Sequence, residues 1–225
     1  MSHLSQRAAA DEAQPTRLAT PSTVAAHVQA VRELPPEDHL DEEEARRGFI
    51  GTVPDAEVRD AYDRLVWSLA DYGFLDAPVA PTTAHPALWR QARLNLIHGL
   101  FRVTDRIYQV RGFDLANMTI IEGDSGLVII DPLTCRETAE AALNLYLRHR
   151  PAKPVVAVIY SHSHADHFGG VKGVVTEADV HAGKVAVIAP SGFMEEAVSE
   201  NIMAGAAMWR RAQFQGGSPL ARNAC

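Results

Sequence analysis

The sequence predicts a layered α/β fold in which helices pack against a sheet. Three short runs rich in β-branched residues, RIYQV, MTIIEG and GLVIIDP, lie among glycines that mark turns, which is typical of a meander of strands. Residues 134–149 return to helical spacing. VVAVIY (Val155 to Tyr160) and KVAVIAP are continuous apolar runs, as expected for strands covered on both faces, and residues 193–209 predict a final helix. This order of strands and helices favours helices layered on a sheet.

The residues before these strands predict a different, mainly helical region. Residues 1–48 are polar and contain an acidic run at 41–44. This composition favours either a loosely packed arm with short helical pieces or a solvated, disordered leader. Between Pro54 and Phe74 the apolar residues recur at helical spacing, so we expect an amphipathic helix there. Residues 88–101 predict a second stretch of helical or mixed structure.

Composition excludes several classes of function. The 225 residues carry a formal net charge of −7, so we expect no basic face for nucleic acid or an anionic membrane surface. No apolar run approaches the roughly 18 residues of a membrane span. The first residues lack the apolar segment of a secretory signal, so we expect a cytoplasmic protein. The two cysteines, Cys135 and Cys225, are too few for a four-thiolate zinc site, so a metal would need histidines and carboxylates.

One short segment, SHSHADHFGG, places residues that bind metal ions directly after a predicted strand. His162 and His164 are two residues apart, so in an extended segment their side chains point to the same side. Asp166 and His167 follow after a turn and can approach from another direction. Imidazole nitrogens and a carboxylate suit zinc, and ligand sites of α/β sheets gather at the carboxyl ends of strands. We therefore predict that these four residues are metal ligands.

Two other interpretations of this segment are weaker. A surface loop that is rich in histidine by chance would not need to follow a buried strand, whereas this segment does. A Ser-His-Asp arrangement using Ser161 or Ser163 would need the glycine pattern of a nucleophile elbow, which neither serine has. Gly169 and Gly170 would let the backbone leave the site tightly.

SHSHADHFGG resembles the H-x-H-x-D-H signature of the metallo-β-lactamase superfamily. Two further segments, QVRGFDLANMTIIEGDSGLVIIDPLT and KVAVIAPSGFMEEAVSENIMAGAAM, resemble the alkyl sulfatases of that superfamily, and the resemblance covers roughly residues 94–212. It implies an α/β fold of the metallo-β-lactamase-like αβ/βα sandwich type. Residues 94–225 would form only its first half, preceded by a helical extension at 1–93. The chain would then be an N-terminal fragment or a truncated homologue.

The resemblance also implies a chemistry. Two zinc ions would be held, one by His162 and His164 and the other by Asp166 and His167, with a metal-bound water completing the site. Family members hydrolyse linear primary alkyl sulfates such as dodecyl sulfate to an alcohol and sulfate, and complete members can form homodimers. Their further metal ligands, two glutamates and a histidine, lie in a later part of their sequences. We therefore expect impaired activity from this chain.

Two more residues are candidates for the same site. Asp131 closes the run LVIID, and the matching aspartate of the superfamily supports the metal loop, because ligand histidines need a partner that fixes their orientation. The alternative for Asp131 is an aspartate turn before Pro132. Asn117 could face the anionic substrate near the metals, or it could be an ordinary turn asparagine.

Three functions remain open on the sequence alone. The leading hypothesis is a zinc-dependent alkyl sulfatase or a fragment of one. Another hydrolase of the same fold, such as a lactonase or thioesterase, is disfavoured because the DLANMT and NIMAG segments match the sulfatase branch. The third hypothesis is a metal-binding remnant or interaction module without catalysis, which the incomplete ligand set supports.

Overall fold

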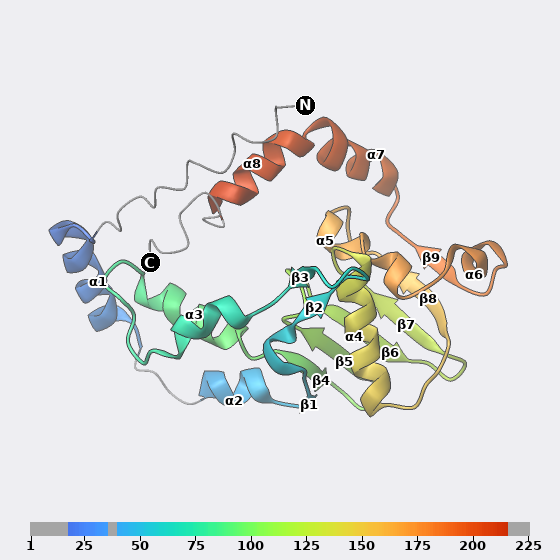
Figure 1. The fold of residues 1–225 in the computed structure, drawn as a ribbon, viewed down its shortest axis with the longest axis horizontal. Coiled ribbons are helices and arrows are strands. Elements are labelled where there is room, and N and C mark those ends of the chain that lie inside the picture. The colour runs from blue at the N-terminus through green and yellow to red at the C-terminus, as the bar shows by residue number, and fades with distance from the viewer. Residues whose placement is uncertain (1–17, 36–39, 216–225) are drawn as a thin grey trace.

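The computed structural model describes residues 18–35 and 40–215 and contains a seven-stranded sheet (Figure 1). In spatial order its strands are β1 (Phe49–Gly51), β4 (Gly99–Arg102), β5 (Ile107–Arg111), β6 (Met118–Glu122), β7 (Leu127–Ile130), β8 (Val155–Ile159) and β9 (Ala186–Ile188). Neighbouring strands from β1 to β7 are antiparallel, whereas β7, β8 and β9 run parallel. The predicted meander and the two later strands are therefore confirmed.

Helices lie before the sheet, on it and after it. They are α1 (Pro21–Glu33), α2 (Leu40–Arg46), α3 (Pro86–Asn95), α4 (Arg136–His149), α5 (Ala165–Phe168), α6 (Glu177–His181), α7 (Phe193–Val198) and α8 (Gly205–Gln215), with a π-helical turn at Ser199–Met203. In Figure 1, α4 lies along one face of the sheet, and α7 and α8 extend over the end of the sheet where α5 lies. Among the residues that the structure describes, no helix has the length and apolarity needed to cross a membrane.

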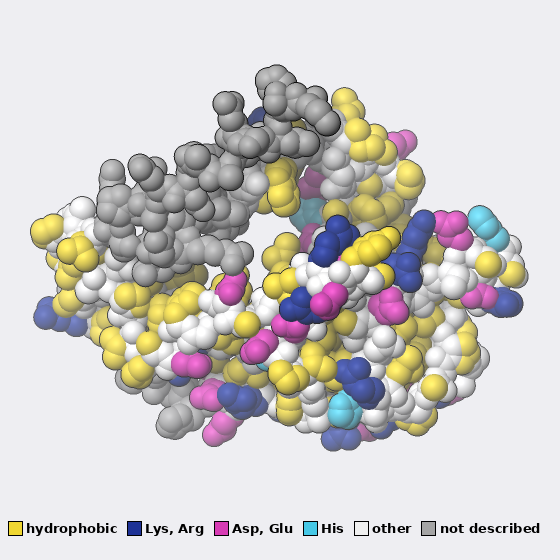
Figure 2. Space-filling model, viewed as in Figure 1, with side chains coloured by type: hydrophobic (Ala, Val, Ile, Leu, Met, Phe, Trp, Pro, Cys, Tyr) yellow, Lys and Arg dark blue, Asp and Glu magenta, His cyan; other side chains and the backbone are white. Residues whose placement is uncertain are grey.

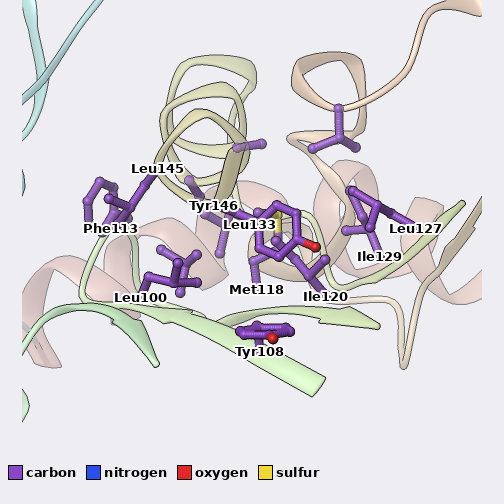
Figure 3. Packing of buried hydrophobic residues seen from close by; sticks show 14 of the residues in the cluster. Leu100, Tyr108, Phe113, Met118, Ile120, Leu127, Ile129, Leu133, Leu145 and Tyr146 are labelled. Carbon is purple, nitrogen blue, oxygen red and sulfur yellow. The ribbon is translucent and has the colours of Figure 1, made fainter. Parts of the chain in front are cut away.

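The hydrophobic core forms between α4 and the face of the sheet that it covers. Alternate residues of β5, β6 and β7 point to this face, as the two-residue period of a strand requires, and all of them are buried: Tyr108, Val110, Met118, Ile120, Leu127 and Ile129. Buried residues of α4 complete the cluster: Ala139, Ala142, Leu145 and Tyr146. Figure 3 shows Tyr146 facing Tyr108, with ring centroids 5.6 Å apart in an edge-on arrangement. The helix predicted for residues 134–149 is confirmed.

A polar network fastens α4 to β6. The Tyr146 hydroxyl donates to Glu122 Oε1 at 2.7 Å, and Arg150 donates to both oxygens of the same carboxylate at 2.8 and 3.1 Å. The hydrogen bond from Arg150 holds the pKa of Glu122 below its usual value. Burial, and then the hydrogen bond to Glu122, raise the pKa of Tyr146, so its hydroxyl stays protonated and donates.

The amphipathic helix predicted between Pro54 and Phe74 is wrong. This segment instead contains a small two-stranded sheet of β2 (Val58–Arg59) and β3 (Leu65–Trp67), flanked by 3₁₀ turns at Pro54–Ala56 and Ala70–Asp76. Val58 is buried in the main core, whereas the intervening Tyr62 is exposed. The apolar spacing that suggested a helix comes from two short strands and a turn.

Local hydrogen bonding explains why this segment does not form a helix. The Asp60 carboxylate accepts the backbone N–H groups of Tyr62 and Arg64, both at 2.9 Å, and so fixes a turn. Asp55 and Asp63 have φ values of 52° and 61°, which lie in the left-handed region and interrupt a right-handed helix. Aspartate side chains that bond to nearby backbone groups compete with helix formation in this way.

The cover expected on the last two strands is largely missing in the described part of the chain. Val187 and Ile188 of β9 are 42% and 49% exposed, so the prediction of a buried strand is wrong there. Among the described residues, β9 is the last strand of the sheet and pairs with β8 alone. In β8 itself, Val158 is fully buried and the other residues are half-buried. In the described part of the chain, the apolar side chains of β9 are therefore left partly exposed.

The segments before and after the main sheet agree in part with the structure predicted from the sequence. The short helical pieces expected within residues 1–48 form as α1 and α2, neither of which has a buried residue. The mixed stretch at 88–101 becomes α3 followed by β4, and the helix at 193–209 forms as α7, the π-helical turn and α8. β1 pairs with β4 in the main sheet. The division of the chain into two parts at residue 93 stays a prediction. Residues 1–17 of the segment 1–48, for which a disordered leader was the alternative, lie outside the described residues, as does Cys225.

Candidate metal centre

The histidine loop, residues 161–167, follows β8 at one edge of the sheet. Because β7 and β8 are parallel, the residues that follow them emerge at the same edge. The backbone N–H of Asp131, which follows β7, donates to the Ile159 carbonyl at 3.0 Å. The end of the loop forms the first turn of α5. The candidate ligands therefore lie where the sequence analysis placed them, at the carboxyl end of a strand.

Three imidazole rings lie against one another in this loop. The ring centroid of His162 is 4.5 Å from that of His164 and 4.1 Å from that of His167. The side chain of His164 is 56% exposed, whereas His162 and His167 are half-buried. Asp166 is in contact with His167. The structure thus brings the four candidate ligands together, and their role as ligands stays a prediction.

The Asp131 carboxylate connects the start of the histidine loop to its end. Its Oδ1 accepts the Ser161 backbone N–H at 2.8 Å, and its Oδ2 accepts the Ser161 hydroxyl at 2.6 Å and His167 Nδ1 at 2.9 Å. Asp131 also has a φ of 56°, a strained conformation that persists only where the surrounding structure enforces it. Contacts of this kind are those that an outer partner of a metal-binding histidine makes.

These hydrogen bonds define which ring nitrogens carry protons. An ionised carboxylate only accepts, so the single hydroxyl hydrogen of Ser161 goes to Asp131. The Ser161 oxygen must then accept from His162 Nδ1, which lies 2.8 Å away. His167 also donates from Nδ1, to Asp131. A neutral ring that donates from Nδ1 keeps on Nε2 the lone pair that a metal ion requires.

The distance between His167 Nε2 and Asp166 Oδ2 tests whether a metal ion fits. Both atoms are acceptors, and they lie 3.4 Å apart. Two ligands of one tetrahedral zinc ion, each about 2.1 Å from it, are also about 3.4 Å apart. This pair of donors therefore fits one zinc ion. Over residues 18–35 and 40–215, no three or more His, Cys, Asp or Glu side chains are arranged to hold a metal, so the pair is not a complete coordination shell.

Asn117 lies in the loop between β5 and β6, at the same edge of the sheet. The register pairs Thr119 of β6 with Ile130 of β7, so the residues before β6 lie beside Asp131. The side chain of Asn117 is exposed. Its proposed contact with an anionic substrate stays a prediction.

Asp114, a buried carboxylate in the same loop, was not predicted from the sequence. Asp114 accepts the backbone N–H and the hydroxyl of Thr134 at 3.1 and 2.6 Å, and the Thr138 hydroxyl at 2.6 Å. It therefore fastens the loop of Asn117 to the segment that follows β7. An aspartate among turn residues gives no sign in the sequence of such distant partners.

Gly169 and Gly170 let the backbone pass close to the segment that follows β7. A Cβ atom on Gly169 would lie 2.2 Å from the Thr134 carbonyl oxygen, and one on Gly170 would lie 2.1 Å from the Pro132 carbonyl oxygen. Any larger residue would push these two segments apart. The tight exit predicted for the glycines is confirmed, and its cause is close packing of backbone.

Comparison with known proteins shows which proteins this chain is similar to. Residues 111–220 match the Metallo-beta-lactamase superfamily. An alkyl/aryl-sulfatase of Saccharomyces cerevisiae is 54% identical over 200 residues, which are 89% of this chain and 31% of the relative. An (R)-specific secondary-alkylsulfatase of Pseudomonas sp. is 53% identical over 221 residues, 98% of this chain and 33% of the relative.

A solved structure agrees with the sequence relatives. The stereoselective inverting sec-alkylsulfatase Pisa1 from Pseudomonas sp. superimposes with a TM-score of 0.83 at 56% identity, over 89% of this chain and 31% of that chain. The metallo-β-lactamase-like fold class and the resemblance to the alkyl sulfatases are confirmed. The superfamily itself points to bound metal ions. The chain spans about a third of the length of these relatives.

Proposed function

We propose that this chain carries the metal loop of a zinc-dependent alkyl sulfatase, which hydrolyses an alkyl sulfate to an alcohol and sulfate. The strongest support is the convergence of three imidazole rings and a carboxylate at the carboxyl end of β8. Besides the secondary-alkylsulfatase, a linear primary-alkylsulfatase of Pseudomonas sp. is 53% identical over 94% of this chain. Dodecyl sulfate is therefore the first substrate to test. A homodimer, expected from the resemblance, remains part of the proposal.

Each residue of the loop has a role in this proposal. His162 and His164 would hold one zinc ion, and Asp166 and His167 the other. When bound, such ions lower the pKa of a water molecule towards neutrality and screen the negative charge of a sulfate group. Asp131 would keep His167 directly, and His162 through the Ser161 hydroxyl, in the proton state that leaves Nε2 free. Asn117, exposed at the same edge, would contact the sulfate.

The chain alone is expected to hydrolyse dodecyl sulfate slowly or not at all. The histidine loop gives about two protein ligands to each of two ions, whereas a catalytic zinc ion normally has about three. Positioning errors of about 1 Å can reduce a rate by about 100-fold. Sulfate release would be measured with excess zinc, for the chain alone and after mixing with the remaining two thirds of a full-length relative. We expect little release alone and more after mixing.

Variants of the histidine loop make this experiment specific. His162→Ala with His164→Ala should abolish the activity that mixing restores. Unchanged release with these variants would contradict the proposal that the loop holds the catalytic metals. Rapid release by the unmixed chain would contradict the expected impairment and place the active site elsewhere in the chain.

A second candidate is a metal-binding module without catalysis. It is favoured by the lack, among the described residues, of three or more side chains arranged to hold one metal. This candidate predicts that the chain binds zinc but that mixing restores no sulfate release. The same pair of assays, zinc content and sulfate release, therefore separates the two functions.

A further inference from the structure

Glu200 brings a second acidic side chain to the histidine loop from outside the motif. Its Oε1 lies 3.1 Å from Nε2 of His164. The residue belongs to the π-helical turn that follows α7, and its side chain is 26% exposed, less than the imidazole it contacts. Among the four candidate ligands, His164 is the most exposed, and Asp131 makes no hydrogen bond to it. Glu200 supplies the partner that Asp131 does not.

Aromatic packing fixes the position of the helix that carries Glu200. Phe193, at the start of α7, stacks on Tyr160 with ring centroids 5.3 Å apart and meets Phe168 edge-on at 5.2 Å. Tyr160 and Phe168 stand on either side of the histidine loop in the sequence, so α7 is anchored to the elements that position the loop. In Figure 1, α7 extends over α5, as these contacts require.

The π-helical turn then directs Glu200 toward the loop. The extra residue in the turn is marked by the hydrogen bond from the Ala204 N–H to the Ser199 carbonyl at 2.9 Å. Asn201, next to Glu200, donates from Nδ2 to the Ala197 carbonyl at 2.8 Å and holds the turn to α7. Single π-helical turns of this kind occur frequently at functional sites. Aromatic packing of α7 and hydrogen bonds within the turn therefore hold Glu200 beside His164.

We propose that Glu200 is a positioning residue that fixes the orientation and tautomer of His164 for metal binding. A carboxylate only accepts, so its Oε1, 3.1 Å from His164 Nε2, would favour the neutral ring that carries its proton on Nε2 and keeps the lone pair on Nδ1. His162 and His167 have the opposite arrangement, because both donate from Nδ1. Glu200 thus selects, for His164 alone, which nitrogen is available to a metal ion.

The test compares Glu200→Ala, Glu200→Lys and Glu200→Gln with Glu196→Ala, which removes an exposed carboxylate four residues earlier on α7. Nitrogen NMR of the metal-free chain at about pH 8.5, where histidine rings are mostly neutral, reports which nitrogen of each ring carries the proton. We expect the Nε2–H form of His164 in the parent, in Glu200→Gln and in Glu196→Ala. Alanine and lysine cannot accept from Nε2, so these two variants should give a mixture at His164 and leave His162 unchanged.

Zinc titration against a competing chelator provides the second readout, and it rests on the proposed zinc site. Loss of an outer partner usually weakens metal binding by about 10–100-fold. We expect such a loss for the alanine and lysine variants, and parent-like affinity for Glu200→Gln and Glu196→Ala. A His164 tautomer that does not change in Glu200→Ala and Glu200→Lys would overturn the inference. A parent chain that binds no zinc would instead overturn the proposed function, while the tautomer result stands on its own.

Discussion

Asp131 accepts three hydrogen bonds that join the residue after β8 to the first turn of α5. Two imidazole rings depend on these bonds for their proton positions, one directly and one through the Ser161 hydroxyl. The positive φ of Asp131 shows that the backbone is held in an unfavourable conformation where the carboxylate makes these contacts. The residue is therefore a sensitive point of the proposed site.

Asp131→Ala should weaken zinc binding by about 10–100-fold, the usual effect of removing an outer partner of a ligand histidine. The zinc affinity of Asp131→Asn should lie between that of Asp131→Ala and that of the parent, because the amide still has one oxygen that accepts hydrogen bonds. Competition with a chromogenic chelator measures the affinity. Asp124→Ala is the matched control, since Asp124 is 97% exposed at the turn between β6 and β7. Equal affinity of Asp131→Ala and the parent would refute the supporting role.

The candidate ligands could be predicted from sequence because they are local. Their type and spacing, together with a strand before them, were enough to identify one loop. Asp114 and Glu200 could not be predicted, because their partners are distant in sequence and only the folded chain brings them together. In the sequence, a glutamate such as Glu200, in the turn that follows α7, cannot be distinguished from an ordinary solvated side chain.

At the scale of elements, the junction between β6 and α4 depends on Glu122. Hydrogen bonds from Arg150 and Tyr146 favour its ionised form, so the pKa of Glu122 is lower in the folded protein than in the unfolded chain. The unfolded chain therefore takes up protons first as the pH falls below about 4.3. The stabilisation is present above that pH and is lost as the pH falls through the folded pKa.

Glu122→Gln should lower the free energy of unfolding at pH 7 by about 1–3 kcal/mol, because two donors lose a charged acceptor. The free energy of unfolding of Glu122→Gln should also fall less than that of the parent between about pH 6 and pH 3, because the variant lacks the carboxyl group that titrates. Urea unfolding followed by circular dichroism measures both effects. Glu140→Gln, at a half-exposed site on α4, should follow the parent at every pH. Parallel acid profiles for the parent and Glu122→Gln would speak against the account of this junction.

Elements were predicted well where one face packs on the core and poorly where side chains fix a turn. Runs rich in β-branched residues between turn glycines identified β5, β6 and β7, and each of these strands has one buried face against α4. The apolar residues between Pro54 and Phe74 match helical spacing by coincidence, and the Asp60 carboxylate decides the local fold by closing a turn. The exposure of β9 could not be predicted from its apolar residues, because exposure depends on which elements lie beside and over the strand in the folded chain.

At the scale of the whole molecule, the last third of the chain presents a large apolar surface. Exposed fractions reach 74% for Ile202, 83% for Met203 and 66% for Trp209, and Val187 and Ile188 of β9 are exposed as well. Figure 2 shows hydrophobic side chains gathered over α7 and the turn that follows it, at the upper right. Within residues 18–35 and 40–215, β9 is the edge strand of the sheet, and exposed apolar side chains and an exposed sheet edge both favour association.

The 225-residue chain should therefore bind a hydrophobic dye and self-associate with increasing concentration. Dye fluorescence and light scattering coupled to gel filtration measure these properties. Ile202→Lys with Met203→Lys should reduce both signals, because the charges interrupt the exposed surface. The same two measurements on Leu18→Lys, exposed far from this surface in the sequence, should resemble the parent. A monodisperse parent without dye binding would be inconsistent with this exposure.

Whether the histidine loop binds zinc, as proposed, can be measured from the metal content of the chain. The parent, loaded with zinc and passed through gel filtration, would be compared with His162→Ala combined with His164→Ala. His149→Ala combined with His181→Ala removes two exposed histidines elsewhere and serves as the matched control. We expect about one or more zinc ions per chain in the parent and the control, and little in the loop variant. Equal zinc in all three proteins would contradict the proposal.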